Sequence, residues 1–469
     1  MRHDTSELTN FIDEQAINNT LALAAKPERA NVLDILNKAR LAKGLTLEET
    51  ATLLQVTDPE LDEKLFETAR HVKKAIYGNR LVLFAPMYIT NECGNSCLYC
   101  GFNVTNKDLT RRTLSHEEIK SDVIALEEQG HKRLLLVYGE HPKLDADWIA
   151  ETVQTVYDTV SEKSGEIRRA NVNCAPLSVE GFRKLQEVGI GTYQCFQETY
   201  HQKTYSSVHT GGVKKDFLWR LHALHRAMEA GIEDVGMGAL FGLYDYKFEL
   251  LALLTHAQEL EKAFGVGPHT ISFPRLEPAL NAEMAYNPPC PIDDTTFKRI
   301  VAILRLAVPY TGLILSTRES ATLRRELLDI GVSQISAGSR TYPGAYSDPE
   351  YDRPEVQQFC ISDNRSLDEV IRDIVDAGYL PSWCTACYRL GRTGEHFMDL
   401  AKKGFIQQYC LPNSLFTFQE YLEDYASEST RKAGKHCITN EVENCPEDRR
   451  SVVESRLKRI EQGERDLYL

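Results

Sequence analysis

Short runs of apolar and β-branched residues alternate with amphipathic stretches from residue 80 onward. Eight of these runs are predicted as strands: Leu81–Thr90, Arg133–Glu140, Arg168–Ala175, Gly191–Thr199, Asp234–Leu243, Thr270–Glu277, Leu313–Ser320 and Gln334–Thr341. Helices are predicted over stretches such as Ser115–Gln129, Asp145–Lys163, Asp216–Ala230, Tyr246–Phe264 and Asp293–Ala307, with a last one over Ser366–Ala377. Eight strand–helix alternations predict an α/β fold, a (β/α)8 TIM-type parallel barrel.

The segments that flank this pattern are predicted to be mainly helical. Asn31–Lys43 has apolar residues at helical spacing, and Thr46 with Glu49 forms a capping box. After Pro412 a charged helical stretch follows, then a surface helix over Glu447–Glu464, with Cys437 and Cys445 in a polar loop of no assigned role. We therefore expect a helical N-terminal extension (1–78), a barrel (79–379) and a mainly helical C-terminal extension (380–469).

Composition narrows the class of protein. The 469 residues carry a formal charge of −14, so a nucleic acid is not an expected partner. The chain has no apolar run of about 20 residues and no apolar signal core at its N-terminus, so we expect no membrane span and a cytoplasmic location. Twelve cysteines in clustered motifs are expected to be metal ligands and not disulfides.

The most informative cluster is Cys93, Cys97 and Cys100, with the spacing C-x3-C-x2-C and Tyr99 before the last cysteine. It follows the first predicted strand, in a loop at the face where such barrels have their active sites. Three thiolates on one loop suit a [4Fe-4S] cluster whose fourth iron has no protein ligand. The motif resembles the signature of the radical S-adenosylmethionine superfamily. A zinc knuckle or three unrelated thiols are the alternatives, but structural zinc needs four ligands.

Charged residues at predicted strand ends extend this resemblance. Gly139 and Glu140 end the second strand, where the superfamily often has Gly-Gly-Glu against the methionyl group, although Tyr138 replaces the first glycine. Glu198 ends the fourth strand and Arg220 follows in the next helix. These two resemble a charged pair that orders S-adenosylmethionine in biotin-synthase-like members. A rim salt bridge is the other reading of this pair.

A second cysteine triad lies near the C-terminus. Cys384, Cys387 and Cys410 have the spacing C-x2-C-x22-C, which again leaves a fourth iron without a thiolate. A zinc site with a remote ligand such as His396 is the alternative. A chain that already holds one cubane cluster favours a second cluster over zinc.

The two triads together resemble the HydG family of tyrosine lyases, which mature [FeFe]-hydrogenase. Runs that carry the resemblance are Tyr-Gly-Glu-His-Pro (138–142), Gly-Pro-His-Thr-Ile-Ser (267–272), Ser-Thr-Arg-Glu (316–319), Ser-Ala-Gly-Ser (336–339) and Cys-Thr-Ala-Cys-Tyr-Arg (384–389). The thiamine-pathway 2-iminoacetate synthases are related but lack the C-terminal triad. The resemblance implies radical cleavage of the Cα–Cβ bond of L-tyrosine to p-cresol and dehydroglycine.

Further implications concern cofactors and partners. The resemblance implies two [4Fe-4S] clusters, S-adenosylmethionine, and an extra iron held with free cysteine and His269. Dehydroglycine would yield carbon monoxide and cyanide for an iron–carbonyl–cyanide unit. A reductant such as ferredoxin or flavodoxin and other hydrogenase maturation proteins would be partners.

The expected tyrosine contacts are Arg318, which we expect to clamp the carboxylate, with Ser336 and Ser339. His269 opens the sixth predicted strand and is expected at the opposite mouth from the first triad, although a core histidine is the other reading. A 2-iminoacetate synthase and a non-enzymatic iron–sulfur scaffold remain as alternative functions.

Overall fold

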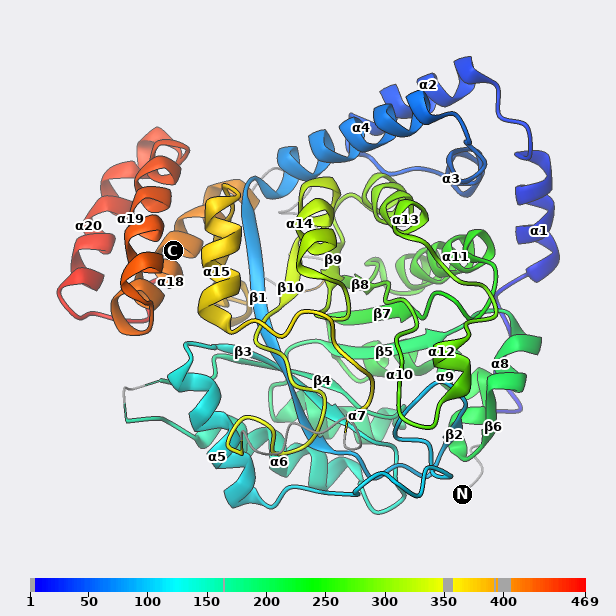
Figure 1. Cartoon of the computed structure of the whole chain (residues 1–469), viewed down its shortest axis with the longest axis horizontal. Helices are drawn as coiled ribbons and strands as arrows, with labels where there is room; N and C mark the ends of the chain where they lie inside the picture. The colour runs from blue at the N-terminus through cyan, green and yellow to red at the C-terminus, as the bar shows by residue number, and fades with distance from the viewer. Residues whose placement is uncertain (1–4, 163–164, 349–356, 392–393, 395–405) are drawn as a thin grey trace.

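A closed barrel of eight parallel strands forms the centre of the molecule (Figure 1), as the alternating pattern predicted. The computed structural model describes residues 5–162, 165–348, 357–391, 394 and 406–469. The strands follow one another around the barrel, and the last closes on the first. They are β1 (Arg80–Thr90), β3 (Arg133–Tyr138), β4 (Arg169–Asn173), β5 (Tyr193–Glu198), β7 (Val235–Ala239), β8 (Thr270–Ser272), β9 (Gly312–Leu315) and β10 (Gln334–Ser336).

Helices surround the barrel. They are α5 (His116–Glu128), α6 (Ala146–Asp158), α7 (Val179–Glu187), α8 (Gln202–Val208), α9 (Phe217–Leu221), α10 (Ala223–Glu229), α11 (Tyr246–Phe264), α12 (Glu283–Tyr286), α13 (Asp294–Ala307), α14 (Ala321–Ile330) and α15 (Leu367–Asp376). The predicted helix over Asp216–Ala230 is broken at His222 into α9 and α10. The helix predicted to reach Lys163 ends at Asp158, and Lys163 lies outside the described residues.

Strand β1 contributes side chains both to the core around the barrel and to a cavity inside it. Leu83, Ala85 and Met87 are fully buried in the core between barrel and helices. The alternate residues Phe84, Pro86 and Tyr88 line an internal cavity instead. Because successive side chains of a strand point to opposite faces, one continuous apolar run serves both purposes.

Between residue 5 and the barrel lie four helices: α1 (Glu14–Leu23), α2 (Arg29–Ala39), α3 (Leu47–Leu54) and α4 (Pro59–Tyr77). α1, α3 and α4 pack against α11, α13 and α14, and α4 leads to the start of β1 (Figure 1). The predicted capping box is formed, since Glu49 N–H donates to Thr46 Oγ1 at 3.2 Å and Thr46 N–H donates to Glu49 Oε2 at 2.9 Å. No helix in the described part of the chain is long and apolar enough to cross a membrane.

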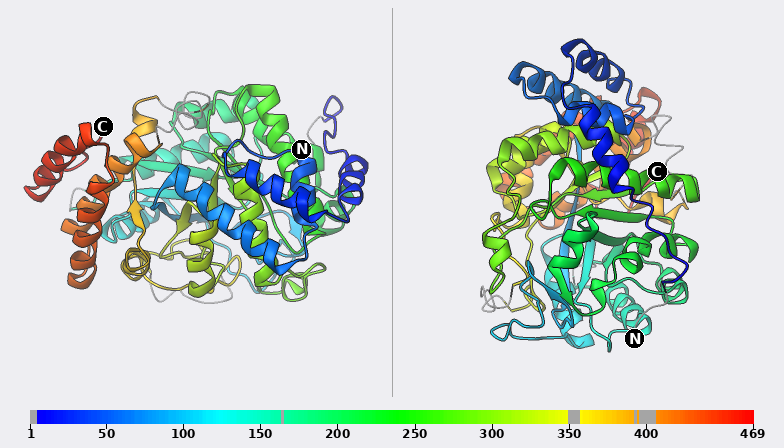
Figure 2. Two further views of the ribbon diagram at one scale, coloured as in Figure 1. Left: turned by 90° about the horizontal axis from the view of Figure 1, so that it is seen from above. Right: turned by 90° about the vertical axis from the view of Figure 1, so that its right-hand side faces the viewer.

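The C-terminal region begins with a strand that the pattern did not predict. β11 (Leu380–Ser382) pairs in parallel with the start of β1, where β1 extends beyond β3 and leaves an open edge. A short helix, α16 (Ala386–Arg389), follows, and then α18 (Leu411–Asp424), α19 (Glu428–Glu443) and α20 (Glu447–Glu461) form a group at one side of the barrel (Figure 2). β11 therefore ties the second cysteine triad to the strand-start end of the barrel.

One prediction for this region is wrong. Cys437 was expected in a polar loop, but it lies in α19 and is 9% exposed. The sequence around it is polar because only one stripe of α19 packs against its neighbours. Cys445 follows the helix and is also buried. None of the twelve cysteines, all within the described residues, forms a disulfide.

Candidate functional site

The first cysteine triad lies at the mouth formed by the strand ends. Cys93, Cys97 and Cys100 follow β1 and line one side of a cavity of about 230 Å³. Part of their loop, β2 (Ser96–Cys97), pairs with β6 (His209–Gly211) after α8. The side chain of Asn103 also donates to the Cys97 carbonyl at 3.1 Å. The loop is thus held from two sides with its three thiols facing one space.

Burial changes the acidity of these thiols. It raises the pKa of Cys97 to about 12 and also raises that of Cys100, with the neighbouring thiols adding to the effect. Thiolates in such a place need bound cations to offset their charge. Among the described residues, no group of three His, Cys, Asp or Glu side chains is arranged so that it could hold a single metal ion. A cubane cluster needs a different geometry, because each thiolate binds a different iron. The three converging thiols fit that geometry.

Gly139 and Glu140 lie directly against the cysteine loop. Gly139 N–H donates to the Thr90 carbonyl at 3.0 Å, and a Cβ on Gly139 would lie 2.2 Å from the Glu92 carbonyl oxygen. Glu140 accepts from Gly94 N–H at 2.8 Å through its carbonyl and from Asn95 Nδ2 at 2.7 Å through its carboxylate. The absence of a side chain at residue 139 is therefore a steric requirement.

The charged residues at the ends of β5 and α9 line the same cavity. Glu198 has a left-handed backbone with φ of 70°, at a shift in strand register. Its carboxylate pairs with Lys214 Nζ at 2.7 Å, while Arg220 Nη2 lies 4.0 Å from Glu140 Oε2. The sequence analysis placed Glu198 and Arg220 at one site, as the structure does, but it did not identify Lys214 as the ion-pair partner of Glu198. Such strain in a non-glycine residue is typical of ligand sites.

The sequence analysis did not identify Asn95 and Lys214 as residues of this site, although each lies beside a recognisable feature of the sequence. Asn95 lies within the cysteine motif, and Lys214 follows Gly211 and Gly212. Gly212 has φ of +82°, and a Cβ there would lie 2.1 Å from Asn95 Oδ1. Tyr99, the aromatic residue of the motif, lines the cavity and its hydroxyl lies 2.8 Å from His209 Nε2.

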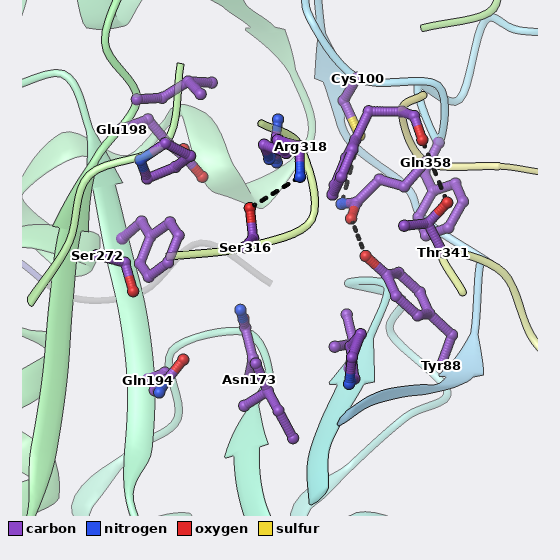
Figure 3. Close-up of a pocket in the computed structure, with 18 of the residues that line it drawn as sticks. Tyr88, Cys100, Asn173, Gln194, Glu198, Ser272, Ser316, Arg318, Thr341 and Gln358 are labelled. Atoms are coloured by element: carbon purple, nitrogen blue, oxygen red, sulfur yellow. Dashed lines mark hydrogen bonds between the residues drawn. The ribbon is translucent and has the colours of Figure 1, made fainter. Parts of the chain in front are cut away.

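The predicted substrate contacts line the same cavity, and Figure 3 shows Arg318 near Cys100. The guanidinium carbon of Arg318 lies 3.4 Å from the centre of the Phe359 ring, and Arg318 N–H donates to Ser316 Oγ at 3.4 Å. Burial lowers the pKa of Arg318, although arginine stays charged. The hydroxyls of Ser336 and Ser339 are buried with no hydrogen-bond partner among the described residues. Buried polar groups of this kind need a ligand or a water.

Several further polar residues line the cavity. Tyr88 donates from its hydroxyl to Gln358 Oε1 at 2.6 Å, and Gln358 Nε2 donates to Cys100 Sγ at 3.8 Å. Figure 3 shows Asn173, Gln194 and Ser272 on the barrel strands below Arg318. They are inward positions of β4, β5 and β8, so strand alternation was the signal that could have identified them.

The second triad lies at the opposite mouth of the barrel. Cys384, Cys387 and Cys410 line a smaller cavity together with His269, which precedes the start of β8. His269 Nε2 lies 3.0 Å from the Tyr388 hydroxyl, and its Nδ1 lies 3.6 Å from Asp234 Oδ1. The structure thus brings together all four predicted residues. His396, the alternative zinc ligand, lies outside the described residues.

Comparisons with known proteins agree with this arrangement. Residues 87–254 match the Radical SAM superfamily, and residues 272–380 match the Biotin and Thiamin Synthesis associated domain. The 2-iminoacetate synthase of Salmonella typhimurium is 32% identical to this chain over 374 residues, which is 79% of this chain and 93% of that protein.

Two solved structures match more of the chain. A crystal structure of HydG, a maturase of the [FeFe]-hydrogenase, is 49% identical with a TM-score of 0.95, covering 98% of this chain and 100% of that one. HydG from Carboxydothermus hydrogenoformans is 43% identical with a TM-score of 0.83, covering 97% and 100%. Taken with the cysteine loop at the barrel mouth, these matches show that the chain belongs to the HydG family of [FeFe]-hydrogenase maturases within the radical S-adenosylmethionine superfamily.

Proposed function

We propose that this chain is a lyase that cleaves the Cα–Cβ bond of L-tyrosine to p-cresol and dehydroglycine. Dehydroglycine is then converted to carbon monoxide and cyanide, which build an Fe(CO)(CN) unit for the hydrogenase H-cluster. The observation that carries the proposal is one cavity lined both by the Cys93–Cys100 loop and by Arg318 with two unpartnered serine hydroxyls.

The residues at the strand ends would hold the cofactors. Cys93, Cys97 and Cys100 would bind a [4Fe-4S] cluster, which with S-adenosylmethionine supplies a 5′-deoxyadenosyl radical when bound. Gly139 offers a close backbone approach, and the charged groups of Glu140, Glu198 and Arg220 suit the ammonium, ribose and carboxylate groups of S-adenosylmethionine. Tyr99 and Lys214 complete this side of the cavity.

The tyrosine would lie against the other side of the cavity. Arg318 presents a planar guanidinium that fits a carboxylate through two parallel hydrogen bonds. Its stacking on Phe359 supports that orientation. Ser336 and Ser339 would complete their hydrogen bonding with polar atoms of the amino acid. The apolar walls at Phe84 and Phe273 would exclude water from the reacting atoms.

The second mouth would carry the later chemistry. Cys384, Cys387 and Cys410 would hold an auxiliary [4Fe-4S] cluster, and His269 with free cysteine would hold an extra iron, since neutral imidazole is a good iron ligand. Burial lowers the pKa of His269, which favours that neutral form. A low-potential carrier such as ferredoxin or flavodoxin would supply electrons, and other hydrogenase maturation proteins would receive the product.

Two other functions make different predictions. A 2-iminoacetate synthase is favoured by the 32% identity to the Salmonella enzyme, but it would release p-cresol without carbon monoxide. A non-enzymatic iron–sulfur scaffold would release neither product. Iron content separates one cluster from two, because two cubanes with an extra iron need roughly eight or nine irons per chain, against four for one cubane.

The direct test replaces one ligand of the first triad. Cys97→Ala should abolish both 5′-deoxyadenosine and p-cresol when the reduced protein is given S-adenosylmethionine and L-tyrosine. Cys360→Ala, which removes an exposed thiol outside both cavities, should keep both products. Undiminished p-cresol from the Cys97 variant would refute the proposed radical chemistry.

A further inference from the structure

A segment of residues 357–363 is attached to the strand-end mouth of the barrel, where the first triad lies. Gln358 N–H donates to the Thr341 carbonyl at 3.0 Å, beyond the end of β10. Ser362 N–H donates to the Thr317 carbonyl at 3.0 Å, beyond the end of β9. Because these bonds are made by the backbone, the position of the segment does not depend on its side chains.

The same segment lies against the loop that carries the first triad. Gly101, directly after the last cysteine of the motif, donates from its N–H to the Gln358 carbonyl at 3.0 Å. A Cβ on Gly101 would lie only 2.7 Å from the Gln357 carbonyl oxygen and 2.9 Å from that of Gln358. The missing side chain at residue 101 therefore lets the segment reach the triad, where Gln358 Nε2 donates to Cys100 Sγ at 3.8 Å (Figure 3).

A second hydrogen bond fixes which way the Gln358 amide faces. The hydroxyl of Tyr88 donates to Gln358 Oε1 at 2.6 Å (Figure 3). Burial raises the pKa of Tyr88, so the hydroxyl keeps the proton that it donates. Because the oxygen and the NH2 group lie on opposite sides of the amide carbon, a bond that holds the oxygen directs the NH2 group toward the sulfur.

The sulfur of Cys100 lies in apolar surroundings. Together with Cys93 it packs against a buried cluster of side chains that consists of Tyr88, Phe102, Leu109 and Val137. A hydrogen bond is electrostatically stronger in such a place than in water. In the loaded protein this sulfur would be an iron-bound thiolate, and hydrogen bonds to the sulfurs are among the features that set the reduction potential of a cluster. A donor favours the more negative, reduced form, so it raises the potential.

We propose that Gln358 is a positioning residue that raises the reduction potential of the cluster held by the first triad, by donating from its amide to Cys100 Sγ. The inference rests on the cluster of the proposed function and not on its substrate. A low-potential carrier loses one electron to the cluster, and the amide keeps both of its protons. A higher potential increases the share of the protein that such a carrier can reduce before S-adenosylmethionine is cleaved.

The test removes the donor by Gln358→Leu, at nearly constant volume. The first cluster is followed by electron paramagnetic resonance in a redox titration of the fully loaded protein, and it is identified by the change in its signal when S-adenosylmethionine is added. Its midpoint potential should fall by about 59 mV, the equivalent of a tenfold change in the equilibrium of a one-electron couple. Tyr88→Phe, which frees the amide to turn, should lower the potential by a smaller amount. Gln154→Leu, which removes an exposed amide on α6, should leave it unchanged.

A second measurement detects the hydrogen bond itself. After exchange into heavy water, electron–nuclear double resonance of the reduced first cluster should show one deuterium coupling fewer in Gln358→Leu than in the wild type. An unchanged potential in this variant would overturn the proposal. So would an unchanged set of couplings, because a shift in potential would then come from a change in solvent access.

A variant that fails to hold its cluster does not end the test. If iron analysis shows that Gln358→Leu lacks the first cluster, the isosteric change Tyr88→Phe decides, and a wild-type potential there would overturn the proposal. No L-tyrosine is present in these measurements, so failure of the proposed lyase function would appear separately, in the p-cresol assay.

Discussion

At the scale of single residues, Gly139 is the clearest case of a position decided by sterics. Its missing Cβ leaves room for the Glu92 carbonyl, which would otherwise lie 2.2 Å away on backbone that carries Cys93. Backbone cannot rotate away as a flexible side chain can. The glycine therefore determines how closely β3 approaches the cysteine loop.

We expect Gly139→Ala to displace the loop and to reduce the iron held at the first triad, with the second triad unaffected. Iron and sulfide analysis, together with 5′-deoxyadenosine formation, would measure this. Gly267→Ala is the matched control, because a Cβ there meets the Ala257 carbonyl only at 3.6 Å. Normal iron content and activity in Gly139→Ala would show that the loop adapts freely.

Arg318 is a second residue whose shape matters as much as its charge. Arg318→Lys keeps the charge but loses the planar fork and the stacking on Phe359. We expect tyrosine affinity to fall by about tenfold and 5′-deoxyadenosine to form without p-cresol, since one charge-assisted bond is worth about 1.5–3 kcal/mol. Arg325→Lys on the exposed face of α14 should change neither quantity. An unchanged tyrosine affinity would require another carboxylate clamp.

At the scale of elements, Glu249 connects the end of β5 to the first turn of α11. Its Oε2 accepts from Tyr200 N–H at 2.8 Å, and its other oxygen accepts from the Thr199 hydroxyl. These are the residues that follow the strained Glu198. Burial raises the pKa of Glu249 from its ordinary value of 4.5 to about 7, and the hydrogen bonds offset the burial only in part.

This raised pKa gives a pH dependence of known sign. Between about pH 4.5 and 7 the folded chain binds more protons at Glu249 than the unfolded chain does, so stability falls as pH rises through that window. Glu249→Gln removes this component while keeping an oxygen that can accept from Tyr200. As the pH rises from 5 to 8, the unfolding free energy of the wild type should therefore fall relative to that of the variant. A difference that does not change with pH would contradict the assignment. Glu128→Gln, which changes an exposed carboxylate on α5, is the control.

At the scale of the whole molecule, the barrel separates the two triads to opposite mouths. The Cys93–Cys100 loop follows a strand end, whereas His269 precedes a strand start and β11 brings Cys384 to that same side. Under the proposed function, the glycine-derived fragment has to cross the barrel interior between the two sites.

This separation predicts a division of products. Cys387→Ala should spare p-cresol and remove carbon monoxide, measured in the same reaction mixture. His269→Ala should keep the second cluster but lose the extra iron, which lowers the carbon monoxide delivered as an iron complex. Cys437→Ala, a buried thiol that lines neither cavity, is the control. Equal loss of both products in the first two variants, with the first cluster intact, would favour a purely structural C-terminal site.

The tertiary structure alone decided which distant groups became partners. Lys214 forms an ion pair with Glu198, β11 pairs with the open edge of β1, and Cys437 is buried on α19. The sequence also does not show that the hydroxyls of Ser336 and Ser339 lack hydrogen-bond partners among the described residues. Each of these depends on contacts between segments far apart in the chain, and a three-residue strand such as β11 leaves no periodic pattern.

The sequence by itself determined the features that arise from local spacing. The alternation of strands and helices predicted the closed barrel, and the capping box at Thr46 formed as expected. The first triad lies on one short loop, so its convergence needed no tertiary information. Placing that loop after a strand end, and His269 before a strand start, predicted their opposite mouths, because all parallel strands of a barrel point the same way.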